Sequence, residues 1–274
     1  MSDKISFYEM AKSRRSVRTF DGKGLEQSVL DNLHEYAKTI ENPFSIPVEF
    51  LFLNAKEHKL SSPVIVGEEY YISAKVKMQE NAEAAYGYSF ENLLMKAHEM
   101  GLGTVWIGGT MPREKFENAS NLQDGEVMPC VSPIGVTASK MGVKEVLMRK
   151  GVKADTRLDF EKLFFDGSFD KPLNKQSAME RGLVNSLEAV RIAPSAVNKQ
   201  PWRVVIKGNT AHFYEKKDKG FDAGDYDLQK IDVGIALYNF EQQMLCEGRK
   251  PVFEQKDPGI SHAQDIEYIA SYRW

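Results

Sequence analysis

The chain has 274 residues, of which 42% are hydrophobic and 27% charged, and its formal net charge is −3. These values are ordinary for a globular protein, and a net charge this small gives no bias toward nucleic acid or an anionic membrane surface. Cys130 and Cys246 lie far apart and outside any CxxC pattern, so no disulfide framework is expected. Because the sequence also shows no signal peptide and no apolar run of membrane-spanning length, we expect a cytoplasmic protein.

The first half of the chain predicts long helices alternating with short strands. We expect helices over 4–13, 25–40 and 81–100, and strands over 48–53, 63–67, 105–107 and within 128–137. The helix over 81–100 is apolar on more than one face, which is typical of a helix buried at the centre of its domain.

The remainder of the chain repeats this alternation after a polar connector. Residues 138–177 are rich in Lys, Gly and Asp, and we expect a surface crossover whose aromatic stretch, 160–165, packs on the core. We then expect a helix over 179–192, a turn over 194–201, strands over 202–206 and 210–215, a buried helix over 231–247, and a final strand or tail over 262–274. This pattern predicts an α+β fold with sheets covered by helices.

Several segments of the first half have counterparts in the second. Gly87 and Gly101 align with Gly234 and Gly248 at a constant offset of 147 residues, and the apolar positions between them correspond. A chain with two related halves can form internally the two-fold interface that other chains form by dimerising. We therefore expect a monomer with a first half at 1–137, a crossover connector at 138–177 and a second half at 178–274, together forming one compact unit.

The segment Arg14-Arg15-Ser16-Val17-Arg18 concentrates three guanidinium groups and a hydroxyl. Arginine side chains match phosphate oxygens in a bidentate manner, and hydroxyls add donors. In an extended strand Arg14, Ser16 and Arg18 would face the same way, which predicts a one-sided anion site. A solvated basic patch is an equally good interpretation of the spacing alone.

A second polar segment, 193–202, follows a helix and reads Ala-Pro-Ser-Ala-Val-Asn-Lys-Gln-Pro-Trp. Its two prolines stiffen the loop, so that Ser195, Asn198 and Gln200 could present hydrogen-bonding groups to a planar heterocycle. A helix-to-strand turn with local capping is the alternative. The equivalent stretch of the first half, 41–47, lacks the Ser, Asn and Gln positions, which favours the binding interpretation.

A third segment, 101–109, reads Gly-Leu-Gly-Thr-Val-Trp-Ile-Gly-Gly. It is not a dinucleotide-binding fingerprint, because Trp106 occupies the third glycine position. Gly108 and Gly109 at a strand end would let backbone N–H groups approach a flat ligand closely, although for this segment taken alone a plain turn is the better interpretation.

These three segments resemble motifs of the FMN-dependent nitroreductase family. Arg14 to Arg18 resembles its RRSxR motif, 193–202 its APSxxNxQPW motif, and 101–109 its GLGxxWIGG segment, while 157–164 resembles the tail that returns an arginine to the phosphate. The resemblance implies a nitroreductase-like fold with two pseudo-symmetric halves and central antiparallel sheets. In ordinary members each FMN lies across a homodimer interface.

This chain keeps the RRSxR and glycine segments only in its first half and the Pro-Ser loop only in its second. Glutamine and lysine at 255–256 stand where the second half would need its glycine pair. The resemblance therefore implies one FMN per chain, as in a fused, monomeric branch of the family. It assigns the phosphate and ribityl chain to Arg14, Ser16, Arg18 and Arg157, with Arg15 either sharing this role or forming a salt bridge. It assigns the flavin ring to Pro194, Ser195, Asn198 and Gln200, and its reactive edge to Gly108 and Gly109.

The resemblance further implies that NADH or NADPH reduces the flavin and that a nitroaromatic, quinone or similar acceptor then takes the electrons in the same cleft. Such ping-pong chemistry needs no catalytic side chain, so we assign none, and the five histidines show no metal-ligand spacing. Three alternatives remain: another flavin chemistry such as dehalogenation or flavin conversion, a flavin-binding protein without turnover, and a site for some other anion.

Overall fold

The computed structural model describes residues 6–274, so the first two residues of the helix predicted at 4–13 lie outside the described part. The chain forms two compact units. The first unit comprises residues 14–155, and the second unit comprises residues 156–274 together with the N-terminal helix α1 (Phe7–Ser13). This division differs from the predicted halves because α1 joins the C-terminal part and the start of the connector joins the first unit.

The first unit is built on an antiparallel sheet in the order β1-β2-β5-β3, with β4 also paired to β2. Its strands are β1 (Val48–Asn54), β2 (Tyr70–Lys77), β3 (Gly103–Thr104), β4 (Glu126–Val127) and β5 (Val131–Gly135). Its helices are α2 (Gln27–Lys38), α3 (Ala82–Glu99), α4 (Arg113–Ala119) and α5 (Val143–Gly151).

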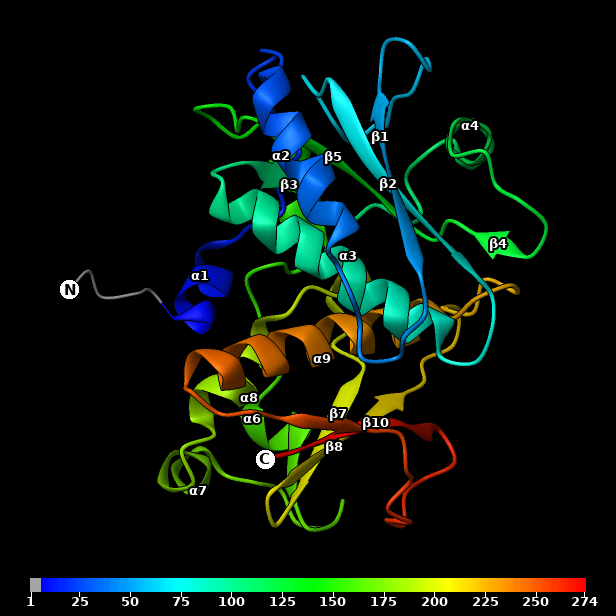
Figure 1. The fold of residues 1–274 in the computed structure, drawn as a ribbon. Helices are drawn as coiled ribbons and strands as arrows, with labels where there is room; N and C mark the ends of the chain where they lie inside the picture. Colours follow the sequence, from blue (N-terminus) through cyan, green and yellow to red (C-terminus); the bar gives the residue numbers. More distant parts are fainter. Residues whose placement is uncertain (1–5) are drawn as a thin grey trace. The chain divides into compact units, whose positions relative to one another are not determined.

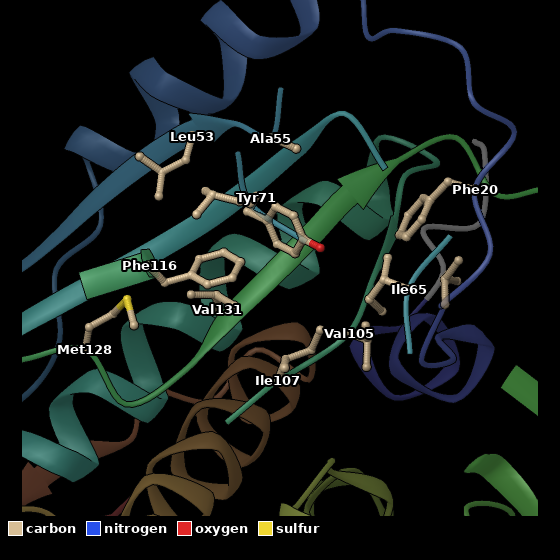
Figure 2. Close-up of a cluster of buried hydrophobic side chains, with 12 residues drawn as sticks. Phe20, Leu53, Ala55, Ile65, Tyr71, Val105, Ile107, Phe116, Met128 and Val131 are labelled. Carbon is tan, nitrogen blue, oxygen red and sulfur yellow. The ribbon is translucent and has the colours of Figure 1, made fainter. Parts of the chain in front are cut away.

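Both faces of this sheet are buried, which explains why nearly every residue of β2 is inaccessible to solvent. The apolar helix α3 packs on one face. On the other face, the ring of Tyr71 meets the ring of Phe116 from α4 with centroids 4.9 Å apart (Figure 2). The cluster in Figure 2 extends from these rings to Phe20, at the end of the arginine segment, so that segment is anchored in the core.

The second unit contains the sheet β6-β7-β8-β10-β9, in which only the β6–β7 pair is parallel. Its strands are β6 (Phe164–Asp166), β7 (Trp202–Lys207), β8 (Thr210–Lys216), β9 (Val252–Glu254) and β10 (Ile266–Arg273). Its further helices are α6 (Phe160–Leu163), α7 (Lys175–Glu180), α8 (Val184–Ile192), the 3-10 turn η1 (Ala196–Asn198) and α9 (Leu228–Cys246).

The two units repeat one arrangement, as the sequence parallels predict. The order β1-β2-β5-β3 of the first sheet has the counterpart β7-β8-β10-β9 in the second. In each unit a long buried helix, α3 or α9, connects the second strand of the sheet to a short edge strand. The α+β class and the two-half architecture are therefore confirmed. The second unit adds β6, whose buried Phe164 brings the aromatic part of the connector into the core.

Three local predictions were wrong. The stretch 63–67 is not a strand of the sheet, because Val66 instead pairs in isolation with the incoming segment at Thr19. The strand predicted at 105–107 ends earlier, at Thr104, because the N–H of Val105 donates to the side-chain hydroxyl of Ser132 in β5 rather than to a backbone carbonyl; Ile107 then forms an isolated bridge with Val131 of the same strand. The helix predicted at 179–192 is two helices, since Gly182 adopts a φ of 66° between α7 and α8.

Candidate functional site

The arginine segment runs in extended form alongside β3. Its Val17 N–H donates to the carbonyl of Thr104 at 2.9 Å, and Val17 is buried in the core of the first unit. A Cβ added to Gly103 would lie 2.9 Å from Val17, so only glycine permits this approach. The GLG glycine therefore serves to seat the arginine segment, and the two motifs adjoin within one unit.

Arg14 lies against a buried carboxylate from α3. Its Nε is 3.8 Å from Oε1 of Glu91, and the side chains are only 8% and 1% exposed. The indole N–H of Trp106 donates to Oε2 of the same carboxylate at 2.8 Å. Burial raises the pKa of Glu91, while the charge of Arg14 and the indole hydrogen bond oppose that rise. Nη1 of Arg14 is buried and has no hydrogen-bond partner within residues 6–274.

Arg15 and Arg18 share a second buried carboxylate, that of Glu145 in α5. Arg15 Nη1 forms an ion pair with Oε1 of Glu145, and the backbone N–H of Arg18 donates to Oε2 at 2.9 Å. Burial lowers the pKa of the Arg18 guanidinium, and the nearby charge of Glu145 counteracts this. Of the two roles left open for Arg15, the structure shows the salt bridge.

The glycine pair follows β3 by four residues rather than ending the strand. The carbonyl of Gly108 accepts a hydrogen bond from Nη2 of Arg113 at 2.8 Å, and Nη1 of the same arginine donates to the carbonyl of Met128. A Cβ added to Gly109 would meet no atom within 4 Å, so this backbone is open on that side. Arg113 thus fixes the position of the pair, and Gly109 leaves space beside it.

The Pro-Ser loop of the second unit is held by its own polar side chains. Ser195 Oγ accepts the N–H of Gln200 at 2.9 Å, and the buried Gln200 side chain accepts the N–H of Leu158 at 2.9 Å through Oε1. Asn198 Nδ2 donates to the carbonyl of Thr156 at 3.0 Å. The loop is therefore tied to the start of the 156–164 segment, as the local-capping alternative predicts for at least part of its polarity.

The loop also carries backbone strain. Val197, Asn198 and Gln200 have φ values of 42°, 60° and 54°, in the left-handed region that non-glycine residues seldom occupy. For the β-branched Val197 this conformation is a clear outlier. Such strain persists only where surrounding contacts impose it and is most often found at functional sites.

Asp232 of α9 supplies one of those contacts. Its two carboxylate oxygens lie 3.1 and 3.0 Å from the N–H of Ala196, which donates to them at the beginning of the 3-10 turn. Asp232 is buried, and desolvation raises its pKa well above the usual value, with Asp227 and Glu215 adding to the rise. Glu215, also buried, has a pKa raised to about 8, chiefly by desolvation.

Arg157 joins the loop rather than standing apart from it. Its Nη2 donates to the carbonyl of Ile192 at 3.0 Å, and its Nη1 donates to Oδ1 of Asn198 at 3.3 Å. The structure therefore brings Arg157, Ser195, Asn198 and Gln200 together in the second unit. Pro194 begins the same loop.

The predicted residues thus form two clusters, one in each unit. Arg14, Arg15, Ser16 and Arg18 lie beside β3 in the first unit, and the loop residues lie together with Arg157 in the second. Three buried carboxylates that hold these segments, Glu91, Glu145 and Asp232, were not among the residues predicted from the sequence. Glu91 and Asp232 could have been noticed as acids inside the two helices predicted to be buried, whereas nothing distinguishes Glu145 in the polar connector.

Within residues 6–274 no group of His, Cys, Asp or Glu side chains is arranged to hold a metal ion. The helices of the same described part are all too short or too polar to cross a membrane.

The fold and its motif segments define a two-unit α+β protein of the nitroreductase type. The family described as "Putative TM nitroreductase" matches residues 6–244, and the chain belongs to this family. A "putative nitroreductase" from Thermotoga maritima shares the fold over 100% of this chain and 95% of its own, with a TM-score of 0.63 and 17% identity.

Other solved structures match about half of the chain. An "FMN-dependent Nitroreductase" from Clostridium difficile covers 52% of this chain and 94% of its own, with 18% identity and a TM-score of 0.41. A "Putative NADH dehydrogenase/NAD(P)H nitroreductase" from Bacteroides thetaiotaomicron covers 49% of this chain and 88% of its own, with 22% identity and a TM-score of 0.42. No curated protein matches the sequence.

Proposed function

We propose that the chain is an FMN-dependent oxidoreductase that takes electrons from NADH or NADPH and passes them to nitroaromatic or quinone-like acceptors. The observation that carries the proposal is that Nη1 of Arg14 is buried and has no hydrogen-bond partner within residues 6–274. A guanidinium nitrogen that is buried without an acceptor is costly, and a phosphate oxygen is the acceptor that arginine matches best. That nitrogen belongs to the family's RRSxR-like segment, and the family match covers it.

The residues present fit the phosphate end of FMN. Arg14 and Arg18 supply positive charge, and the hydroxyl of Ser16 lies between them in the sequence. Within residues 6–274 the structure records no hydrogen bond or ion pair for the Arg18 guanidinium, so its donors remain available. Arg15 is placed outside this set, because its charge is already balanced by Glu145.

The residues of the second unit fit the heterocycle end less directly. Ser195, Asn198 and Gln200 hold one another and the 156–158 backbone, so their first role is to fix the strained loop. We propose, from the motif resemblance, that Pro194 and Arg157 together with this loop contact FMN, and that Gly108 and Gly109 supply backbone groups to the flavin ring. One FMN per chain follows from a single arginine segment and a single Pro-Ser loop.

When bound, FMN supplies the hydride and electron transfer chemistry itself. The protein's contribution is therefore to hold the phosphate, to shape the surroundings of the ring and to admit donor and acceptor in turn. No side chain is assigned a catalytic role.

Turnover separates this function from flavin binding without activity. Protein loaded with FMN should oxidise NADH or NADPH in the presence of an artificial quinone or nitroaromatic acceptor, and initial rates at several acceptor concentrations should give the parallel reciprocal plots of a ping-pong mechanism. Flavin-loaded protein that consumes neither nicotinamide with any acceptor would leave only the binding function.

A further inference from the structure

The three arginines of the RRSVR segment differ in what already occupies their donors. Arg15 is ion-paired with Glu145 through Nη1, and its side chain is 29% exposed. Arg14 approaches Glu91 only through Nε, at 3.8 Å, and its Nη1 is buried without a partner in the described chain. A single carboxylate thus satisfies Arg15 and leaves the other two guanidinium groups with donors to spare.

Glu145 also fixes the backbone of the segment. Its Oε2 accepts a hydrogen bond from the backbone N–H of Arg18, so one side chain contacts the segment at both Arg15 and Arg18. The residue that precedes α5 is also bonded to the chain just after the arginine segment, because the N–H of Gly142 donates to Oγ1 of Thr19 at 3.0 Å. A Cβ at Gly142 would lie 2.9 Å from that hydroxyl oxygen, so the attachment requires glycine.

The exposed fractions of the α5 side chains show that the helix buries Glu145 rather than an apolar face. Glu145 is 1% exposed, whereas Val143, Val146 and Leu147 on the same helix are 77%, 50% and 63% exposed. An amphipathic helix ordinarily buries its apolar residues and exposes its acids. Here the acid is buried and the apolar residues are not, so α5 is held to the first unit by polar contacts to the arginine segment.

We propose that Glu145 is a positioning residue for the anion site: it withdraws Arg15 from ligand binding and pins Arg18, so that Arg14 and Arg18 make the phosphate contacts. This inference rests on the proposed function and refines it. A buried carboxylate that balances one cation prevents the segment from presenting a third guanidinium to the ligand. It also sets the register in which the remaining two are presented.

The test compares FMN with riboflavin, which lacks the phosphate, so that the ratio of their dissociation constants isolates the phosphate contacts. In an Arg15→Gln background, where no third guanidinium can be released, Glu145→Ala removes the acceptor of the Arg18 N–H and should reduce the preference for FMN about tenfold while leaving riboflavin affinity unchanged. In the same background, Glu145→Gln keeps one acceptor oxygen, which can serve the Arg18 N–H, and should retain the preference within about threefold. Glu35→Ala, which removes an acid from an exposed ion pair with Lys38, is the matched control.

The role of Arg15 is tested in protein that keeps Glu145, because the ion pair with that carboxylate is what withdraws Arg15 from the ligand. The amide of a glutamine at position 15 can still donate a hydrogen bond to Glu145, so the buried carboxylate keeps a partner. In this protein Arg15→Gln should change the preference for FMN less than about threefold, whereas Arg14→Gln should reduce it at least about tenfold. An equal loss for both arginines, or an unchanged preference in Glu145→Ala, would overturn the inference. Wild-type protein that binds neither flavin would instead defeat the proposed function.

Discussion

The arginine segment of the first unit and the Pro-Ser loop of the second are fixed by opposite means. The arginine segment is extended and relies on charge, with Glu145 balancing Arg15 and Glu91 lying beside Arg14. The loop is tightly turned, relies on hydrogen bonds among neutral groups, and rests on Asp232, whose pKa is raised well above its usual range. This difference agrees with the proposal that the arginine segment binds an anionic group and the loop a neutral, planar one.

Removing the two arginines proposed to bind the phosphate should have the largest effect on FMN binding. The double variant Arg14→Ala/Arg18→Ala should weaken FMN binding about 100-fold or more, because each lost charge-assisted hydrogen bond contributes about 1.5–3 kcal/mol. Isothermal titration with FMN measures this. The double variant Lys23→Ala/Lys38→Ala removes two exposed cations of the same unit and should bind normally. Unaffected flavin content in the arginine variant would refute the phosphate assignment.

The buried acids of the second unit should make its stability depend on pH. The pKa of Glu215 is raised to about 8 in the folded protein, above its ordinary 4.5. A raised carboxyl pKa means that the unfolded chain releases its proton first, so stability falls as pH rises from about 4.5 to about 8.

Glu215→Gln removes this loss. Thermal and urea unfolding should show the variant up to about 5 kcal/mol more stable than the wild type at pH 9, with the difference vanishing near pH 4.5. Asp227 raises the pKa of Glu215, whereas Lys217 and Lys230 lower it, and Glu215 in turn raises the pKa of Asp232, so the difference between the two proteins includes these interactions. A gain of equal size at both pH values would show that packing, not ionisation, separates the two proteins.

A smaller effect is expected where the loop meets α9. Asp232→Ala removes the acceptor of the Ala196 N–H and should weaken FMN binding about tenfold, the equivalent of one hydrogen bond. Asp232→Asn keeps one acceptor oxygen and should bind FMN within about threefold of the wild type. Equal losses in both variants would mean that the charge of Asp232 matters, contrary to its raised pKa.

The smallest effect concerns the strain in the loop. Val197 is 58% exposed at a φ of 42°, so Val197→Asn should relieve strain without losing packing and should stabilise the protein by about 0.5–1 kcal/mol. Val252→Asn, at an exposed position without a positive φ, should give no gain. Destabilisation by the Val197 change would indicate that its side chain is needed for the turn.

The sequence was sufficient to predict what depends on local pattern. The long buried helices α3 and α9 and the repeated order of elements followed from periodicity and from the internal parallels. The failures came where distant contacts override the local pattern. Residues 63–67 have the composition of a strand, but Val66 forms only an isolated bridge with Thr19 and does not join the sheet.

The same limit applies to the candidate site. The polar motifs were visible in the sequence, but their partners were not, because Glu145 is separated from Arg15 by 130 positions and lies in an otherwise polar connector. For the loop, the predicted hydrogen-bonding residues are engaged with one another and with 156–158, which only the folded chain reveals. The motif residues could therefore be identified from the sequence pattern, whereas the partners of each residue could be identified only from the structure.

The most direct test of the account is the flavin content of the purified protein after incubation with excess FMN and removal of the free cofactor. The account predicts a flavin absorbance spectrum and about one FMN released per chain, since one arginine segment and one Pro-Ser loop are present. A colourless protein that retains no FMN would contradict the proposed function. Two FMN per chain would contradict the claim that only one complete set of binding segments survives.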